Sequence, residues 1–332
     1  MNSYFERSML EKSIVNCAQI ERKVVKKRGV RWQHRSLTSM KLRAFFYLLF
    51  TVIFFTCLSL IGCSLTTITV NTTAKMIKRG LPALYEEADL EVAETALVSN
   101  LKLLEVLLKN DPGNTSILLL LAQGYNAYAL GFVEDDEPER ARYFYLKGRD
   151  FALEVLNSNQ KFQKIFPKPL AEFDAFLLTL DEKYLEALFW CAGNWGNWIM
   201  LSLDDPRAIF ELAKVEAMMS RVLELDETYY FAGAHLFFGS LLAARPAMFG
   251  GKPDLAQQHF EKALTLTDHK FLLTKVYYAR FYAVRLLDEE LFTRLLTDVI
   301  EADVNILPHY TLITTIAKKK AQLWLTKKED LF

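Results

Sequence analysis

The feature that most constrains the fold is the spacing of apolar residues. From Leu81 onward they recur three and four residues apart over long stretches, interrupted only at proline, glycine and aspartate clusters. This spacing places them on one face of an α-helix. Strict alternation and Asn-Gly hairpins, which indicate strands, are almost absent. We therefore expect an all-α fold, with helices near 68–79, 82–88, 90–109, 115–130, 138–157, 168–178, 181–202, 206–225, 228–244, 253–266, 270–286, 289–301 and 307–326.

Pairs of these helices resemble divergent tetratricopeptide (TPR) hairpins, in which small residues let two helices approach and a large residue fills the gap. The small, large, small sets of the second helices are Ala256, Phe260 and Ala263, and Ala141, Tyr145 and Gly148. The matching sets of the first helices are Phe238, Gly239 and Leu242, and Leu121, Ala122 and Tyr125. The resemblance implies one α-α superhelical domain over 81–326. The intervals between paired helices exceed those of the repeat, so an unrelated antiparallel helical bundle remains the alternative.

The N-terminal region has the pattern of an export signal. Residues 44–61 are uncharged, follow Lys41 and Arg43, and end in small residues. The stretch from Leu60 to Cys63 resembles the bacterial lipobox, in which the cysteine is lipidated and becomes the new N-terminus. We therefore expect a signal peptide over 40–62 and a membrane anchor on Cys63, since buried acyl chains hold a protein on a bilayer.

A plain transmembrane anchor is the alternative, because 18 uncharged residues can also span a bilayer. Residues 1–39 are longer and more polar than a usual signal start, so Met40 is the better start and 1–39 a doubtful extension. Residues 63–80, rich in threonine, are expected to be a tether that includes the start of the first helix. Ser64 favours the outer over the inner membrane by the enteric sorting rule.

Charge and cysteine content restrict the partners and the chemistry. The chain has 40 basic and 40 acidic residues, of which 11 basic and 3 acidic residues precede residue 63. The body therefore has 29 basic and 37 acidic residues, a net charge of about −8. Nucleic acid is therefore not an expected partner, because phosphate binding needs a basic surface. Only Cys191 remains in the body besides Cys63, so neither a disulfide framework nor a CxxC metal site is possible there.

Nothing in the sequence indicates an enzyme. The motifs HExxH, GxSxG, GxxxxGK[ST] and the Rossmann glycine run are absent, and the histidines of the body lie far apart. We expect no cofactor and no bound metal. The acidic run 134–139 is interpreted as the first turn of the helix around Pro138, and the lysines 318–320 as a solvated face.

A cluster of tryptophans is the strongest candidate site. Three of the four tryptophans in the body lie within the nine residues 190–198, and Gly193 and Gly196 open space beside them. One interpretation is a ligand-lined helix face, since Trp and Asn together suit an apolar site with few polar groups. Core packing is the competing interpretation. The residues concerned are Trp190, Asn194, Trp195, Asn197 and Trp198.

Three further residues complete the candidate ligand set. Arg245 and Phe249 belong to the inserted loop 245–251, and inserted loops often carry function. His235 lies on an apolar helix, where a hydrogen-bonded core histidine is the alternative to a pocket residue.

Together the lipobox, the degenerate hairpins, the segment LFWCAGNWGNW and the loop PAMFGG before AxxxFxxA resemble the T component of tripartite ATP-independent periplasmic (TRAP) transporters. The resemblance covers about residues 60 to 320. It implies a periplasm-facing lipoprotein that binds the transporter's solute-binding protein, can form a homotrimer, and has a pore for small, hydrophobic solutes. Of the family's functional residues, it carries over only the lipidated cysteine, onto Cys63. The alternative function is a TPR-type lipoprotein adaptor of an envelope assembly machine.

The anchor is directly testable. Replacing Cys63 with alanine should abolish metabolic acyl labelling and release the protein into a soluble fraction, because the thiol that carries the lipid is gone. Labelling that persists in the Cys63→Ala variant would contradict the lipid anchor on Cys63. A variant that stays in the membrane fraction would favour the transmembrane alternative.

Overall fold

The computed structural model describes residue 19, residues 21–27 and 43–53, and residues 67–332. The chain divides into two units, Met1–Thr66 and Thr67–Phe332. In the first unit, residues 21–27 and 43–53 are helical. Cys63, the end of the apolar segment, and most of residues 1–39 lie outside the described residues, so the signal peptide and the anchor stay predictions.

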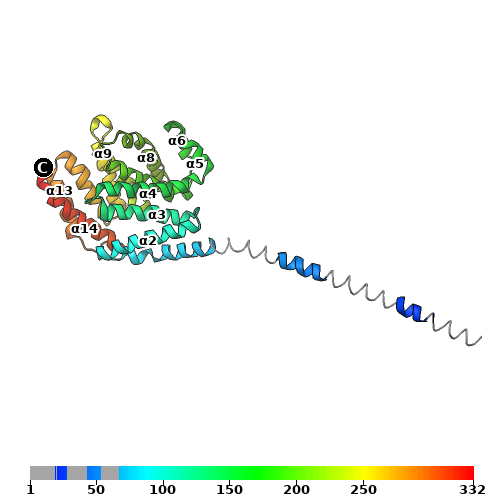
Figure 1. Cartoon of the computed structure of the whole chain (residues 1–332). Coiled ribbons are helices and arrows are strands. Elements are labelled where there is room, and N and C mark those ends of the chain that lie inside the picture. Colours follow the sequence, from blue (N-terminus) through cyan, green and yellow to red (C-terminus); the bar gives the residue numbers. More distant parts are fainter. Residues whose placement is uncertain (1–18, 20, 28–42, 54–66) are drawn as a thin grey trace, which may run out of the picture. The chain divides into compact units, whose positions relative to one another are not determined.

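The second unit, called the body below, is built from helices, and residues 67–332 contain no β-strand (Figure 1). This confirms the predicted all-α class. A helix over 67–85 comes first. The elements that follow are α2 (Leu90–Asn110), α3 (Thr115–Tyr128), η1 (Ala129–Val133), α4 (Pro138–Asn157), α5 (Gln160–Ile165), α6 (Leu170–Leu177), η2 (Glu182–Tyr184), α7 (Leu185–Met200), α8 (Pro206–Leu225), α9 (Tyr229–Ala244), η3 (Ala247–Phe249), α10 (Pro253–Leu266), α11 (Leu273–Tyr277), η4 (Tyr278–Ala283), α12 (Val284–Leu286), α13 (Glu289–Glu301), α14 (Thr311–Thr326) and α15 (Lys328–Leu331).

The start of the body differs from the expected one. Residues 67–85 form one continuous helix, whereas two helices were predicted on either side of Gly80. Val70 and Ala74 of this helix are buried in the core together with Leu97 and Leu101 of α2. The described part of the expected tether, which was predicted to include the start of the first helix, belongs to this packed helix, and the compact unit begins at Thr67.

Two other differences lie in the middle and near the end of the chain. A short helix, α5, was not predicted; the Asn159 side chain caps it by accepting hydrogen bonds from the backbone of Lys161 and Phe162, and Phe162 is fully buried. The helix predicted over 270–286 is divided into α11, the π-helical turn η4 and α12. A second π-helical turn, η1, extends α3. Such turns are rare and often mark functional sites.

Helices that are neighbours in sequence pack against one another from α2 to α4, from α7 to α10, and from α13 to α14. α14 also packs against α2, so the last long helix of the chain meets the first part of the body (Figure 1). The small, large, small residues of the two predicted hairpins are all buried in α4 and α10. The tetratricopeptide assignment itself stays a prediction.

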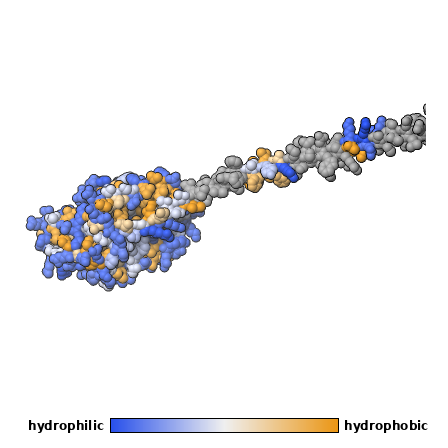
Figure 2. Space-filling view, turned by 90° about the horizontal axis from the view of Figure 1, so that it is seen from below, coloured by the Kyte–Doolittle hydropathy of each residue, from blue (hydrophilic) through white to orange (hydrophobic). Residues whose placement is uncertain are grey.

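α3 and η1 together, Thr115–Val133, are long and apolar enough to cross a membrane, but most of this stretch is buried within the body, as in the core helix of a globular protein. The surface of the body mixes apolar and hydrophilic areas, including the side that carries α2 (Figure 2).

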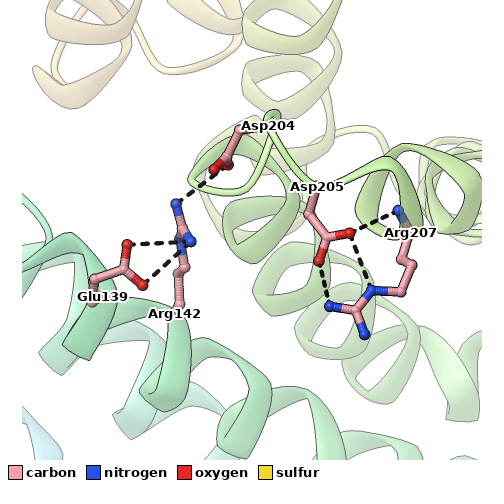
Figure 3. A network of polar contacts seen from close by, with 5 residues as sticks. All are labelled: Glu139, Arg142, Asp204, Asp205 and Arg207. Carbon is pink, nitrogen blue, oxygen red and sulfur yellow. Dashed lines mark hydrogen bonds and ion pairs between the residues drawn. The ribbon is translucent and has the colours of Figure 1, made fainter.

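Ion pairs join α4 to the turn before α8 (Figure 3). Arg142 lies between Glu139, with Nη1 to Oε1 3.2 Å, and Asp204, with Nη2 to Oδ1 3.5 Å. Asp205 caps α8 by accepting the backbone N–H of Arg207 at 2.9 Å and pairs with its guanidinium. The cap contributes about 1 kcal/mol, whereas exposed pairs of this kind contribute little.

Candidate functional site

The body contains a cavity of about 210 Å³. Its wall is contributed by helix 67–85, α2, α3, η1, α7, α8, α9, α11, η4 and α14, so residues from both ends of the body meet there. Most of the lining side chains are Leu, Ile, Phe and other apolar residues. A void of this volume has room for on the order of fifteen water molecules. An apolar cavity with a few polar groups is the usual form of a small-molecule site.

α7 brings two of the predicted ligand residues to this cavity. Trp190 and Asn197 line it, together with Gly193 between them. The Trp190 ring lies edge-on against Tyr230, with 4.6 Å between ring centroids, and its indole nitrogen is buried beside the Tyr229 hydroxyl. A Cβ atom at Gly193 would meet nothing within 4 Å, so the cavity reaches the helix backbone at this glycine.

Asn194 lies on the buried side of the same helix. Its amide nitrogen donates to the carbonyls of Ala122 at 3.0 Å and Trp190 at 2.8 Å, and its oxygen accepts from Asn126 at 3.3 Å. A Cβ atom at Gly148 of α4 would lie 2.5 Å from that oxygen. Asn194 is therefore held between α3, α4 and α7 and does not line the cavity.

The other two tryptophans also point away from the cavity wall. The Trp195 indole donates to Glu211 at 2.7 Å, and the Arg149 guanidinium lies over its ring at 5.2 Å. Trp198 is half-buried and packs against the apolar core. Each interpretation therefore describes part of the tryptophan segment. Trp190 and Asn197 line the cavity, and the other three residues pack elsewhere in the body.

The remaining predicted residues lie elsewhere. His235 Nδ1 is 2.9 Å from His259 Nδ1, and its Nε2 is 3.3 Å from Glu227. Burial, together with the neighbouring His235, lowers the pKa of His259 to about 4, and burial lowers that of His235, so both rings are neutral at pH 7. The structure thus gives His235 the position of a hydrogen-bonded core histidine.

The inserted loop is a compact turn between α9 and α10. Arg245 pairs with Glu216 of α8. A Cβ atom at Gly251 would lie 2.0 Å from the Arg245 carbonyl oxygen, and Gly250 has φ of 89°, so both positions require glycine. The side chain of Phe249 lies outside what the structure describes. A ligand role for the residues of this loop stays a prediction.

The sequence did not reveal the polar group of this cavity, which we call the Glu134 network. Glu134 lines the cavity and is buried; its Oε1 accepts from Lys320 at 2.9 Å and its Oε2 from Tyr145 at 2.5 Å. Lys320 also bonds to Asp135, and the Arg280 Nη1 lies 3.7 Å from Glu134 Oε1. The interpretation of 134–139 as a helix's first turn and of 318–320 as a solvated face is therefore wrong for Glu134 and Lys320.

Electrostatics keeps Glu134 ionised despite its burial. Burial by itself would raise the pKa of this carboxyl, but the charges of Lys320 and Arg280 and the Tyr145 hydroxyl outweigh it and hold the pKa below its usual value. Both π-helical turns lie at this network. η1 ends at the residue before Glu134, and η4 contains Arg280. The only sequence signal was Arg280, a lone charge within the apolar run VYYARFYAV.

A strained turn borders the cavity at the start of α9. Tyr230, Phe231 and Ala232 all have left-handed backbone angles, with φ of 45°, 60° and 57°. Non-glycine residues in this conformation cost about 1–2 kcal/mol each. Aromatic packing holds the turn: the Phe231 ring stacks on Phe271 with centroids 4.6 Å apart, and Tyr230 packs on Trp190. Strain of this kind concentrates at functional sites.

Among residues 67–332 and the other described segments, no group of three or more His, Cys, Asp or Glu side chains is placed to hold a metal ion.

The Glu134 network should matter for stability. Replacing Lys320 with methionine should lower the free energy of unfolding by about 3–5 kcal/mol, because it leaves a buried carboxylate without its main partner. Chemical denaturation measures this change. The exposed neighbour provides the control: Lys319→Met should change the free energy by less than about 0.5 kcal/mol. Equal effects of the two substitutions would contradict the buried pair.

Comparison with known proteins agrees with this architecture. A relative named only as an uncharacterized protein, from Treponema pallidum (strain Nichols), is 23% identical over an alignment of 266 residues that covers 74% of this chain and 81% of the relative. The family model of the TRAP transporter T-component matches residues 86–332, which include most of the body and nearly all of the cavity wall. The protein therefore belongs to the TRAP transporter T-component family, whose role is associated with a transporter of the bacterial envelope.

Proposed function

We propose that this protein is a periplasm-facing lipoprotein, anchored through Cys63, that binds the solute-binding protein of a TRAP transporter and holds a small, largely apolar solute in its central cavity. The observation that carries the ligand part is the cavity itself, whose wall is mainly apolar and joins helices from both ends of the body. Membership of the T-component family supports the transporter part.

The cavity wall is prepared for a ligand without rearrangement of the core. Trp190 adds an aromatic ring to the wall, and Asn197 adds an amide. These groups would orient a solute that is otherwise held by apolar contacts. The outer membrane is the proposed location of the anchor, and a homotrimer is the proposed assembly.

A TPR-type adaptor of an envelope assembly machine remains the second candidate from the sequence. Such a protein would present a continuous concave groove for a peptide. The interior cavity and the family membership favour the transport function instead.

Filling the cavity tests the ligand part. We expect Gly193→Leu to reduce binding of the neutral apolar dye N-phenyl-1-naphthylamine to the full-length protein by about tenfold or more, because a leucine here projects into the open space beside α7. Dye fluorescence measures the binding. The matched control is Gly80→Leu, since Gly80 is also a helical glycine with nothing within 4 Å of its Cβ position but is exposed. Equal dye binding by the wild-type protein and both variants would argue against a ligand cavity.

Crosslinking in intact cells tests the partner. A photo-reactive group on exposed positions of the body should capture a periplasmic solute-binding protein under transport-inducing conditions, and mass spectrometry identifies it. Gly193→Leu should leave this capture unchanged, because docking uses the surface and not the cavity. Consistent capture of envelope assembly proteins in its place would favour the adaptor.

A further inference from the structure

Arg280 differs from the other charged groups of the Glu134 network. Its guanidinium carbon lies 4.9 Å from the ring centroid of Phe281 and 4.7 Å from that of Trp324. Its closest approach to a carboxylate, 3.7 Å from Glu134, is too long for a hydrogen bond. Within the described chain the guanidinium donates no hydrogen bond, and the residue lines the cavity. Arg280 thus presents unused donors at the cavity wall.

The other charged groups of the Glu134 network already have hydrogen-bond partners among themselves. Lys320 donates to Glu134 and Asp135, and Tyr145 donates to the second oxygen of Glu134. Glu134 therefore does not depend on Arg280 for its hydrogen bonds. Glu134, Asp135 and Lys320 together carry one net negative charge, which repels a dianion more strongly than a monoanion.

The guanidinium is also pre-oriented. Stacking against Phe281 and Trp324 restricts its rotation, which lowers the entropy lost when it binds a ligand. A planar guanidinium matches the two oxygens of a carboxylate and can donate to both at once. The rest of the wall is mainly apolar, so transfer of a hydrocarbon chain from water into the cavity is favourable.

We propose that Arg280 binds the head group of an amphiphilic monocarboxylate whose hydrocarbon part occupies the central cavity. This inference rests on the proposed ligand-binding function of the cavity and specifies the class of solute. The cavity, with room for on the order of fifteen water molecules, accommodates a chain of about ten carbons.

Calorimetric titration of the full-length protein in phospholipid nanodiscs tests the proposal, with empty nanodiscs as the blank. The probes are decanoate and decanol at neutral pH, which share the chain and differ in the charge of the head. Arg280→Gln should weaken decanoate binding by about tenfold or more and leave decanol binding unchanged, because only the carboxylate uses the guanidinium. The control is Arg285→Gln, an exposed arginine outside the cavity wall, which should change neither affinity.

The outcomes separate the head-group proposal from the cavity function. If both probes bind the wild-type protein and Arg280→Gln affects them equally or not at all, the head-group proposal is wrong and the cavity function stands. If neither probe binds the wild-type protein, the head-group proposal and the cavity function are both wrong. Gly193→Leu should weaken both probes, since it fills the shared space.

A second variant covers the case in which Arg280→Gln does not fold, which a thermal melt detects. Arg280→Lys keeps the positive charge near Glu134 and loses the planar pair of donors. It should weaken decanoate binding several-fold and spare decanol. Unchanged decanoate affinity in a folded Arg280→Lys protein would overturn recognition by the guanidinium.

Discussion

The architecture depends on a buried amide at the junction of three helices. Asn194 bonds to the Ala122 carbonyl and the Asn126 side chain of α3, while Gly148 lets α4 approach the same point. A buried amide with all these partners is stabilising, whereas one left unpaired would cost about 1–3 kcal/mol. The junction therefore sets the rotation of α7. Because Trp190 and Asn197 are on the same helix, that rotation also turns them toward the cavity.

The cavity wall combines a charged region with an aromatic one. The Glu134 network supplies charge at the two π-helical turns, and the strained turn at Tyr230 and Phe231 supplies aromatic rings. Both features are costly for a fold, since buried charges lose hydration and left-handed residues are strained. Their location at the same cavity is consistent with a ligand site. The proposed role of Arg280 joins them, because an amphiphile needs one charged contact and a long apolar surface.

Much of the fold could be predicted from the sequence, whereas much less of the candidate site could. Helix spacing identified nearly every long helix, because burial of one face leaves a period in the sequence. Of the five residues that the sequence singled out in the tryptophan segment, only Trp190 and Asn197 reach the cavity, and their role as ligand residues stays a prediction. Asn194 and Trp195 have the same composition signal, but Asn194 is hydrogen-bonded to α3 and Trp195 to Glu211, and neither lines the cavity. Glu134 and Lys320 were assigned to the surface because each lies in a run of like charges, which is usually solvated.

The sequence by itself determined the helical class, the acidic and disulfide-free body, and the resemblance that family membership confirms. These properties follow from local patterns of residues. Only the tertiary structure decided that Glu134, Arg280 and Lys320 meet, because they come from three segments far apart in the chain. The cavity was decided at the same level: α14 packs against α2, and the space between such distant helices depends on their packing and not on the period of any one of them.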